Sequence, residues 1–289
     1  MGLMLTEAKL NELKEYFSRQ PEVALAFLFG SEAKGTTHAE SDVDIGVYFK
    51  PATRALEYET DKYYPEEEKI WSDLDKIIGR QVELVVLNRA PVTLFAAVLG
   101  EGVKIFCRDE VLLGRLTPAI EDLAEEFVNL VDDFVEIKAR SRSLSSADRT
   151  RLRGLIDFIR DQLPDFRGFA SVTQFQYERD KSIKRNLERW AETLTTALID
   201  VAKILVASAK RPIPRTYKSI VRDLAFLDGF DESTAVALAG FSDLRNLLAH
   251  EYLDLRFSLL SKFVKDGEPL YRRLLDFTET FITSAGGKN

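Results

Sequence analysis

Two aspartates, Asp42 and Asp44, stand two positions apart at the start of an apolar run that extends to Phe49. In a strand, side chains two residues apart share a face, so these carboxylates are expected to point the same way. Carboxylates that converge beside an apolar strand are costly to bury unless a cation lies between them. Mg²⁺ suits such a pair, because it binds through one or two carboxylates together with substrate phosphates.

A second apolar run, residues 23–29, precedes these aspartates and ends at Gly30 and Ser31. Glycine lets the backbone approach an anion closely, and a serine that opens a short helix offers a hydroxyl and an N–H to a triphosphate. The structural alternative is a hairpin-like strand pair in which Asp42 and Asp44 are turn or edge residues. Strand, Gly-Ser and Asp-x-Asp on a second strand together favour a nucleotide site.

This combination resembles the signature of the nucleotidyltransferase superfamily, in particular its minimal (MNT) branch, over about the first 110 residues. The resemblance implies transfer of a nucleoside monophosphate from an NTP such as ATP, with carboxylate-held Mg²⁺. The family pattern includes a third acidic residue, usually Asp, on a neighbouring strand, and Glu83 takes that place in the strand expected over 80–87. The extra methylene of Glu83 displaces its carboxylate, and a misplacement of about 1 Å can cost on the order of 10²-fold in rate. An ordinary exposed strand glutamate is the alternative.

A second constellation lies late in the chain, where Arg245, His250 and Tyr252 form Arg-x₄-His-x-Tyr. Arginine holds a phosphate in a bidentate fork and histidine moves a proton near neutral pH, which suffices for metal-free attack of a ribose 2′-OH on its own phosphodiester. Five residues turn a helix by roughly 140°, so either the helix ends near His250 or two copies of the motif meet in a dimer. The alternative is a helix C-terminus at which His250 favours the dipole and Arg245 makes a surface ion pair.

The sequence Arg-Asn-Leu-Leu-Ala-His-Glu-Tyr in a helical region resembles the motif of the HEPN family, and the resemblance covers roughly 147–284. That family's Arg-x₄-His motif marks RNases that work as dimers, and the nearby tyrosine marks HepT-type toxins, which MntA-type minimal nucleotidyltransferases silence with AMP. The resemblance therefore implies a fused toxin–antitoxin-like protein in which Tyr252 is modified. RNA, possibly tRNA, would be the substrate of Arg245 and His250.

The apolar patterns predict an α/β domain with a small mixed sheet over 1–140, followed by an all-α helical bundle over 147–289. The two resemblances imply that the first has the nucleotidyltransferase fold and that the second is a HEPN-type bundle. A Ser-rich stretch between them is the expected joint. Expected elements include helices at 6–20, 55–79, 171–209, 231–253 and 257–284, and strands at 23–29, 43–49, 80–87 and 103–107. The acidic residues from Glu57 to Asp75 are expected on a solvated helix face.

Composition excludes several classes of protein. The 289 residues include 47 acidic and 40 basic ones, a net charge of −7 that argues against a general nucleic-acid coat protein. The single cysteine, Cys107, allows no internal disulfide and fits a reducing cytosol. With His38 and His250 as the other soft ligands, a structural zinc site is ruled out. Neither a signal peptide nor a membrane span is indicated, so a cytoplasmic protein is expected.

Several alternatives stay open. The cations Lys210, Arg211, Arg215, Lys218 and Arg222 form either an RNA-backbone track or a solvated helix end. The apolar residues Phe241, Leu244, Leu247 and Leu248 serve either a dimer contact or the internal core. A rival function is a small-molecule nucleotidyltransferase similar to the kanamycin-modifying enzymes, which leaves Arg-x₄-His-x-Tyr unexplained. A third possibility is a catalytically inactive binding module, which applies if Glu83 does not bind the metal ion.

Overall fold

The computed structural model describes residues 5–36, 42–140, 143–250 and 257–284, and for Asn246, Ala249 and His250 it describes the backbone alone. The chain forms two compact units, Met1–Val128 and Asn129–Asn289. The division falls within one long helix, α5 (Glu110–Arg140), which therefore contributes residues to both units. The limits expected from the sequence place the whole of α5 in the first domain and stay a prediction.

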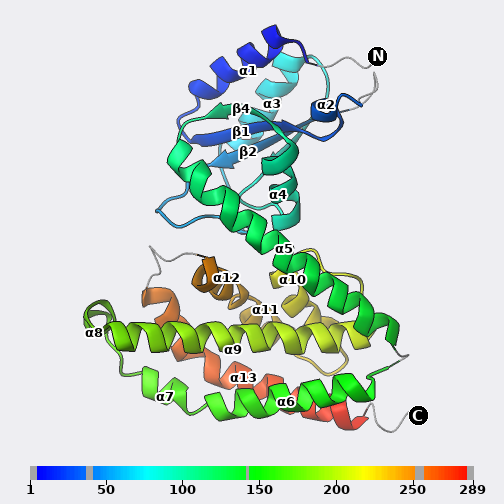
Figure 1. Cartoon of the computed structure of the whole chain (residues 1–289), viewed down its shortest axis with the longest axis vertical. Coiled ribbons are helices and arrows are strands. Elements are labelled where there is room, and N and C mark those ends of the chain that lie inside the picture. The colour runs from blue at the N-terminus through cyan, green and yellow to red at the C-terminus, as the bar shows by residue number, and fades with distance from the viewer. Residues whose placement is uncertain (1–4, 37–41, 141–142, 251–256, 285–289) are drawn as a thin grey trace. The chain divides into compact units, whose positions relative to one another are not determined.

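A four-stranded mixed sheet forms the centre of the first unit, which confirms the predicted α/β fold (Figure 1). The strands lie in the order β3-β2-β1-β4. Strand β1 runs antiparallel to β2 and β4, whereas β2 and β3 are parallel. In chain order the elements before α5 are α1 (Glu7–Ser18), β1 (Val23–Phe29), α2 (Gly30–Lys34), β2 (Val43–Phe49), α3 (Glu67–Ile78), β3 (Val82–Val86), α4 (Val92–Glu101) and β4 (Val103–Cys107).

The central strands of this sheet are buried on both faces because nearly all their side chains are apolar. Leu13 and Phe17 of α1 are fully buried against them. Arg108, which follows β4, donates to the carbonyl oxygens of Phe17 at 3.2 Å and of Ser18 and Gln20 at 3.0 Å. Since the last carbonyls of a helix need such donors, Arg108 closes α1 and sets the point at which β1 begins.

The first part of the predicted helix at 55–79 is wrong, because the segment before α3 is not helical. Glu57 is buried there and accepts a hydrogen bond from the Tyr64 hydroxyl at 3.0 Å. Glu59, at a φ of +49°, accepts the N–H of the first residue of α4 at 3.1 Å. These two carboxylates bind the segment to the folded unit, so the expectation that they lie on a solvated helix face is also wrong.

The second unit is helical in all its described secondary structure, which confirms the predicted all-α region. None of the helices in the described ranges has the length and apolarity needed to cross a membrane. After α5 the elements are α6 (Ser146–Gln162), α7 (Asp165–Phe169), α8 (Gln174–Arg179), α9 (Lys181–Ser208), α10 (Tyr217–Arg222), the 3₁₀ turn η1 (Asp223–Phe226), α11 (Glu232–Ala239), α12 (Ser242–His250) and α13 (Phe257–Ser284).

Two helices that the apolar pattern predicts as continuous are each divided in the structure. The segment 171–209 forms α8 and α9, because the Asp180 carboxylate accepts the N–H groups of Ser182 at 2.8 Å and Ile183 at 3.1 Å and so caps α9. The described part of the segment predicted at 231–253 forms α11 and α12, with Gly240 closing α11, and residues 251–253 lie outside the described ranges. Apolar spacing continues across both breaks, so it does not reveal them.

An aromatic cluster around Phe263 of α13 holds the centre of the bundle. The centroid of its ring lies 4.9 Å from that of Phe241, 5.4 Å from Trp190 and 5.6 Å from Phe166. Ring pairs at such distances stabilise by about 0.5–1.5 kcal/mol each beyond the area that they bury. Because Phe241 immediately precedes α12, this cluster fixes the position at which α12 begins.

An ionic network joins the later part of α5 to α6 and α9. Asp133 of α5 accepts two hydrogen bonds from Arg151, at 3.1 and 2.9 Å. It also pairs at 2.8 Å with Lys203, which is buried and pairs in turn with Asp200 at 2.8 Å. The hydrogen bonds from Arg151 and the charge of Lys203 lower the pKa of Asp133 from its ordinary 3.8 to about 2.

This network predicts a loss of stability in acid. A carboxyl whose pKa is lower in the folded state stabilises that state above pH 4, and the stabilisation disappears as the pH falls through 2. Since Asp133 is about a quarter exposed, we expect Asp133→Asn to reduce the free energy of unfolding by about 1 kcal/mol at pH 7 after solvent screening. Urea titrations should show this deficit shrinking as the pH falls from 4 to 2. Asp157→Asn, at an exposed pair, is the control and should show no such dependence.

Candidate functional site

Two of the predicted site residues, Asp44 and Glu83, lie in one row across adjacent strands, and a third, Gly30, lies directly beside that row. Phe29, the last residue of β1, is the register partner of Asp44 on β2, and Asp44 is the register partner of Glu83 on β3. Gly30 follows Phe29 directly and begins α2 (Figure 1). Asp42 lies immediately before β2 and is exposed. The end of β1 and the starts of β2 and β3 therefore bring the predicted glycine and carboxylates together along one edge of the sheet, namely the edge that these strand ends form.

The carboxylates of this row repel one another. Asp44 is half-buried, and its pKa is raised, first by burial and then by the negative charges of Glu83 and Asp42. A hydrogen bond that the Asp44 and Glu83 carboxyl groups share raises the pKa of Asp44 further. Neighbouring carboxylates with raised pKa values are a recurring feature of functional sites, where a cation or a proton offsets the repulsion.

Gly30 is the point at which the backbone comes closest to Asp44. Its φ of +68° lies in the left-handed region, which favours glycine. A Cβ atom at this position would lie 1.9 Å from Oδ2 of Asp44. No other residue type fits without displacing the Asp44 carboxylate, so the Gly-Ser sequence and the Asp-x-Asp sequence depend on each other. Ser31, the next residue of α2, is half-buried.

The donor set at this edge suits a magnesium ion that arrives with a nucleotide. Within the described ranges, no three side chains of His, Cys, Asp or Glu are grouped closely enough to hold a metal ion. Asp44 and Glu83 instead form a pair, with Asp42 adding its charge nearby. Since Mg²⁺ uses one or two carboxylates plus substrate phosphates, such a pair fits the ion when ATP supplies the remaining ligands. The three metal ligands Asp42, Asp44 and Glu83 stay a prediction.

Two residues that support this site are not predicted from the sequence. Glu32 of α2 has a fully buried side chain, and its Oε2 lies 2.9 Å from Nη2 of Arg80, which precedes β3. This ion pair joins the helix that carries Ser31 to the strand that carries Glu83. Removing one partner of a buried pair typically costs about 3–5 kcal/mol, so both residues keep the edge in place. A glutamate and an arginine in polar segments carry no sequence signal that they are paired.

Helix α3 sets the start of β3. The Trp71 indole N–H donates to the carbonyl oxygen of Val82 at 2.7 Å, and the Val82 N–H donates to the Asp75 carboxylate at 2.9 Å. Both backbone groups of the residue before Glu83 are thus held by side chains of one helix. The strand register, and with it the position of Glu83 opposite Asp44, depends on these two bonds.

The second predicted site lies on α12. Arg245 is half-buried, and its Cζ lies 5.1 Å from the centroid of the Tyr217 ring on α10. The backbone of His250 belongs to the same helix as Arg245, five residues further along the chain. The side chains of Asn246 and His250, and Tyr252 as a whole, lie outside what the structure describes. Their roles stay predictions.

The apolar residues of this motif divide between two environments. Phe241 and Leu244 are buried in the bundle, whereas Leu247 and Leu248 are half-buried. Phe241 belongs to the aromatic cluster around Phe263. The core role left open by the sequence therefore holds for Phe241 and Leu244. Self-association through the helical region stays a prediction.

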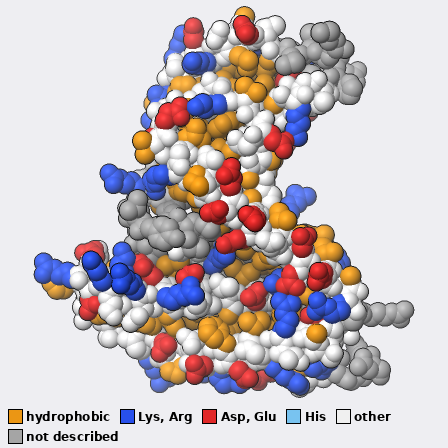
Figure 2. All heavy atoms as spheres, viewed as in Figure 1, with side chains coloured by type: hydrophobic (Ala, Val, Ile, Leu, Met, Phe, Trp, Pro, Cys, Tyr) orange, Lys and Arg blue, Asp and Glu red, His pale blue; other side chains and the backbone are white. Residues whose placement is uncertain are grey.

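Three of the five cations before the motif helix are engaged within their own unit. Lys210 donates to the carbonyl oxygen of Lys138, and Arg211 to that of Phe226. Lys218 pairs with Asp243 at 3.5 Å. The engagement of these three cations favours the solvated helix end over a continuous RNA track. On the face drawn in Figure 2, several basic side chains gather at the left end of the helical unit, and acidic and basic ones are mixed over the rest of it.

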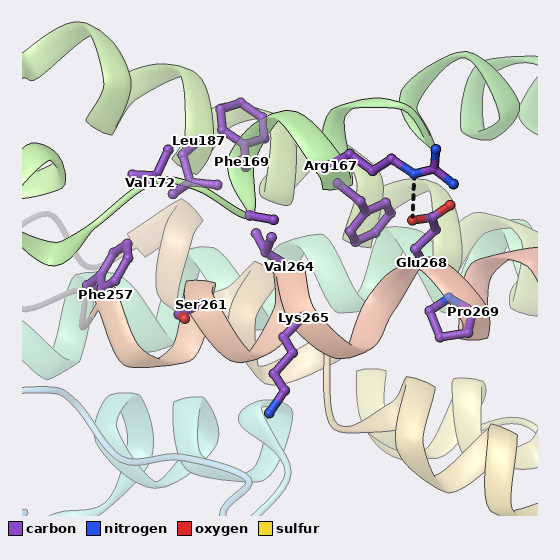
Figure 3. Close-up of a pocket in the computed structure, with 12 residues that line it drawn as sticks. Arg167, Phe169, Val172, Leu187, Phe257, Ser261, Val264, Lys265, Glu268 and Pro269 are labelled. Carbon is purple, nitrogen blue, oxygen red and sulfur yellow. Dashed lines mark ion pairs between the residues drawn. The ribbon is translucent and has the colours of Figure 1, made fainter.

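A cavity of about 400 Å³ lies within the helical unit, between α7, α9 and α13 (Figure 3). Its walls are mostly apolar. At one end Arg167 and Glu268 form an ion pair, with Nε of the arginine 3.9 Å from Oε2 of the glutamate. None of the described residues that line it is a predicted site residue. We assign it no role in the chemistry.

Comparisons with known proteins match the two regions to two families. The family model Polymerase beta, Nucleotidyltransferase matches residues 11–111. That range includes Gly30, Asp44 and Glu83. The family model Ribonuclease HepT-like matches residues 159–277, which include Arg245. No curated protein matches the chain.

Among solved structures, a crystal structure of a toxin–antitoxin with AMP-PNP is 25% identical, covering 45% of this chain and 98% of its own, with a TM-score of 0.33. A structure of the toxin–antitoxin MntA–HpeT with two Asp-to-Glu changes is 24% identical. One of the same pair with a Tyr-to-Ala change is 25% identical. Coverage and TM-score are the same for all three.

Proposed function

Since this chain joins a nucleotidyltransferase region of the polymerase beta type to a ribonuclease HepT-like region, we propose that the first unit transfers AMP from Mg-ATP to Tyr252. The transfer silences RNA cleavage by Arg245 and His250. The observation that carries the proposal is the placement of Asp44 opposite Glu83 on adjacent strands, with Gly30 directly after the β1 residue that pairs with Asp44, in the same chain as the Arg-x₄-His-x-Tyr motif.

In the transfer, the Tyr252 oxygen attacks the α-phosphorus of ATP. A new O–P bond forms, the bond from that phosphorus to the bridging oxygen breaks, pyrophosphate leaves with the electron pair, and the phenolic proton passes to water. Asp44 and Glu83 hold the magnesium nucleotide, while Ser31 and the backbone at Gly30 receive the phosphates. Bound Mg²⁺ supplies charge neutralisation of the triphosphate.

RNA cleavage needs no metal in this account. The ribose 2′-OH attacks the adjacent phosphorus, the 5′-oxygen leaves, and a cyclic 2′,3′-phosphate forms. His250 accepts the 2′-OH proton or delivers one to the leaving oxygen, and Arg245 stabilises the charge that develops on the phosphorus oxygens. Arginine suits this role because it stays charged and presents several N–H donors in one plane.

Modification silences cleavage through local charge. Tyr252 is two residues from His250 in the sequence, a span of at most about 7 Å of chain, so we infer that AMP on Tyr252 reaches the nuclease motif. Its phosphate is a strong acceptor for Arg245 and competes with the RNA phosphate for the same guanidinium. One arginine cannot hold both anions, and so the modified protein does not cleave.

The test is to incubate the full chain with Mg-ATP, with and without kanamycin, and to measure intact masses of the protein and the antibiotic. We expect the protein mass to rise by whole AMP units and kanamycin to stay unmodified. AMP on kanamycin with an unchanged protein mass would replace this proposal with the small-molecule nucleotidyltransferase. No transfer to either acceptor would favour the inactive binding module.

A further inference from the structure

Helix α10 presents one aromatic ring to the motif helix α12. Tyr217 is the first residue of α10, and a capping box fixes its place: Thr216 Oγ1 accepts the Ser219 N–H at 3.0 Å, and Ser219 Oγ accepts the Thr216 N–H at 3.0 Å. The Tyr217 side chain is 3% exposed. Its ring therefore has a fixed position in the bundle.

The guanidinium of Arg245 lies over this ring, with Cζ 5.1 Å from the centroid. A second link joins the same two helices, since Lys218 of α10 pairs with Asp243 of α12 at 3.5 Å. The Lys218 side chain is only 17% exposed. The two contacts come from consecutive residues of α10. Together they fix how far α12 lies along its axis relative to α10, and how it is rotated about that axis at Arg245.

Contact with a ring face suits a phosphate-binding arginine. The attraction acts between the cation and the face of the ring, so the ring contact does not itself use the in-plane N–H donors, which are the groups that bind a phosphate bidentately. A long side chain on an exposed helix face samples many rotamers, whereas one held on a buried ring samples few. The ring thus orients the guanidinium before RNA arrives.

On these contacts we propose that Tyr217 is a positioning residue of the nuclease site, which holds Arg245 in the orientation that stabilises the scissile phosphate. The inference rests on the proposed RNase function of Arg245. It also gives a role to part of the cationic segment: Lys218 acts through Asp243 as a brace for α12 rather than as a contact to RNA.

The experiment compares steady-state RNA cleavage by unmodified full-length variants. Tyr217→Met keeps a side chain of similar length without a ring face, and we expect kcat to fall roughly tenfold with little change in KM. Tyr217→Phe keeps the ring and should retain most of kcat. Ile220→Ala removes another buried side chain of α10, so it should lower the melting temperature but leave kcat close to that of the wild type.

Each outcome decides a separate point. If Tyr217→Met folds and keeps the wild-type kcat, or if Tyr217→Phe loses as much as Tyr217→Met, the positioning role is wrong. If Tyr217→Met does not fold, Tyr217→Leu and Tyr217→Phe make the same comparison of ring against no ring. If the wild type and Arg245→Ala cleave RNA equally, the nuclease assignment itself fails, whatever Tyr217 does.

Discussion

Asp44→Asn should reduce AMP transfer by about a thousandfold or more. The amide keeps the shape of the side chain but removes the charge that holds a magnesium nucleotide, and the metal contributes several kcal/mol of transition-state stabilisation. The melting temperature of this variant should rise or stay unchanged. Asp44 faces Glu83 and is half-buried, so its ionised form opposes folding, and a neutral side chain relieves that repulsion. Transfer of radiolabelled AMP and a thermal melt measure the two quantities.

Asp73→Asn is the matched control. Asp73 is an aspartate of the same unit that accepts a hydrogen bond from the Tyr16 hydroxyl at 3.0 Å and lies on α3, away from the row of carboxylates. This variant should label with AMP at a rate close to the wild-type rate. Undiminished labelling of Asp44→Asn would contradict the assignment of the sheet edge as the transferase site.

Arg245→Ala should reduce RNA cleavage by on the order of 10²–10³-fold, the typical cost of losing one donor to a developing oxyanion. His250→Ala should cost on the order of 10²–10⁴-fold, because a general acid or base is lost. AMP transfer should continue in both variants, since Asp44 and Glu83 are unchanged. Cleavage of a fluorescent RNA by the ATP-free protein is the measurement.

Arg189→Ala is the control for this pair of variants. Arg189 lies on α9 of the helical unit, with a side chain that is 72% exposed and an ordinary ion pair to Glu192 at 3.1 Å. Its loss should leave cleavage unchanged. If Arg245→Ala and His250→Ala cleave as fast as Arg189→Ala, the Arg-x₄-His motif is a surface feature of a helix end and not a nuclease site.

The sequence predicts the parts of this protein that depend on local pattern. The apolar run before Gly30 and the run from Val43 to Phe49, which Asp44 interrupts, predict β1 and β2, since short and mostly apolar runs are typical of strands buried on both faces. Glu83 is predicted from its place in the third such run. The helical second half follows from apolar spacing in the same way.

Features that depend on long-range packing are not predicted. The parallel pairing of β2 with β3, which places Asp44 opposite Glu83, depends on the order of strands in the sheet. The buried pair of Glu32 and Arg80 and the contact of Tyr217 with Arg245 join residues whose separation in the sequence carries no signal. The break at Asp180 shows the same limit, because a capping side chain overrides an apolar period that continues through it.

The central claim is that one chain carries a nuclease together with the transferase that silences it through Tyr252. The most direct measurement maps AMP by peptide mass spectrometry after incubation with Mg-ATP, and assays RNA cleavage by the same samples of wild type and Tyr252→Phe. We predict AMP on Tyr252, wild-type cleavage that ATP suppresses, and Tyr252→Phe cleavage that ATP does not restrain. AMP on another residue, together with equal suppression of both proteins by ATP, would contradict the account.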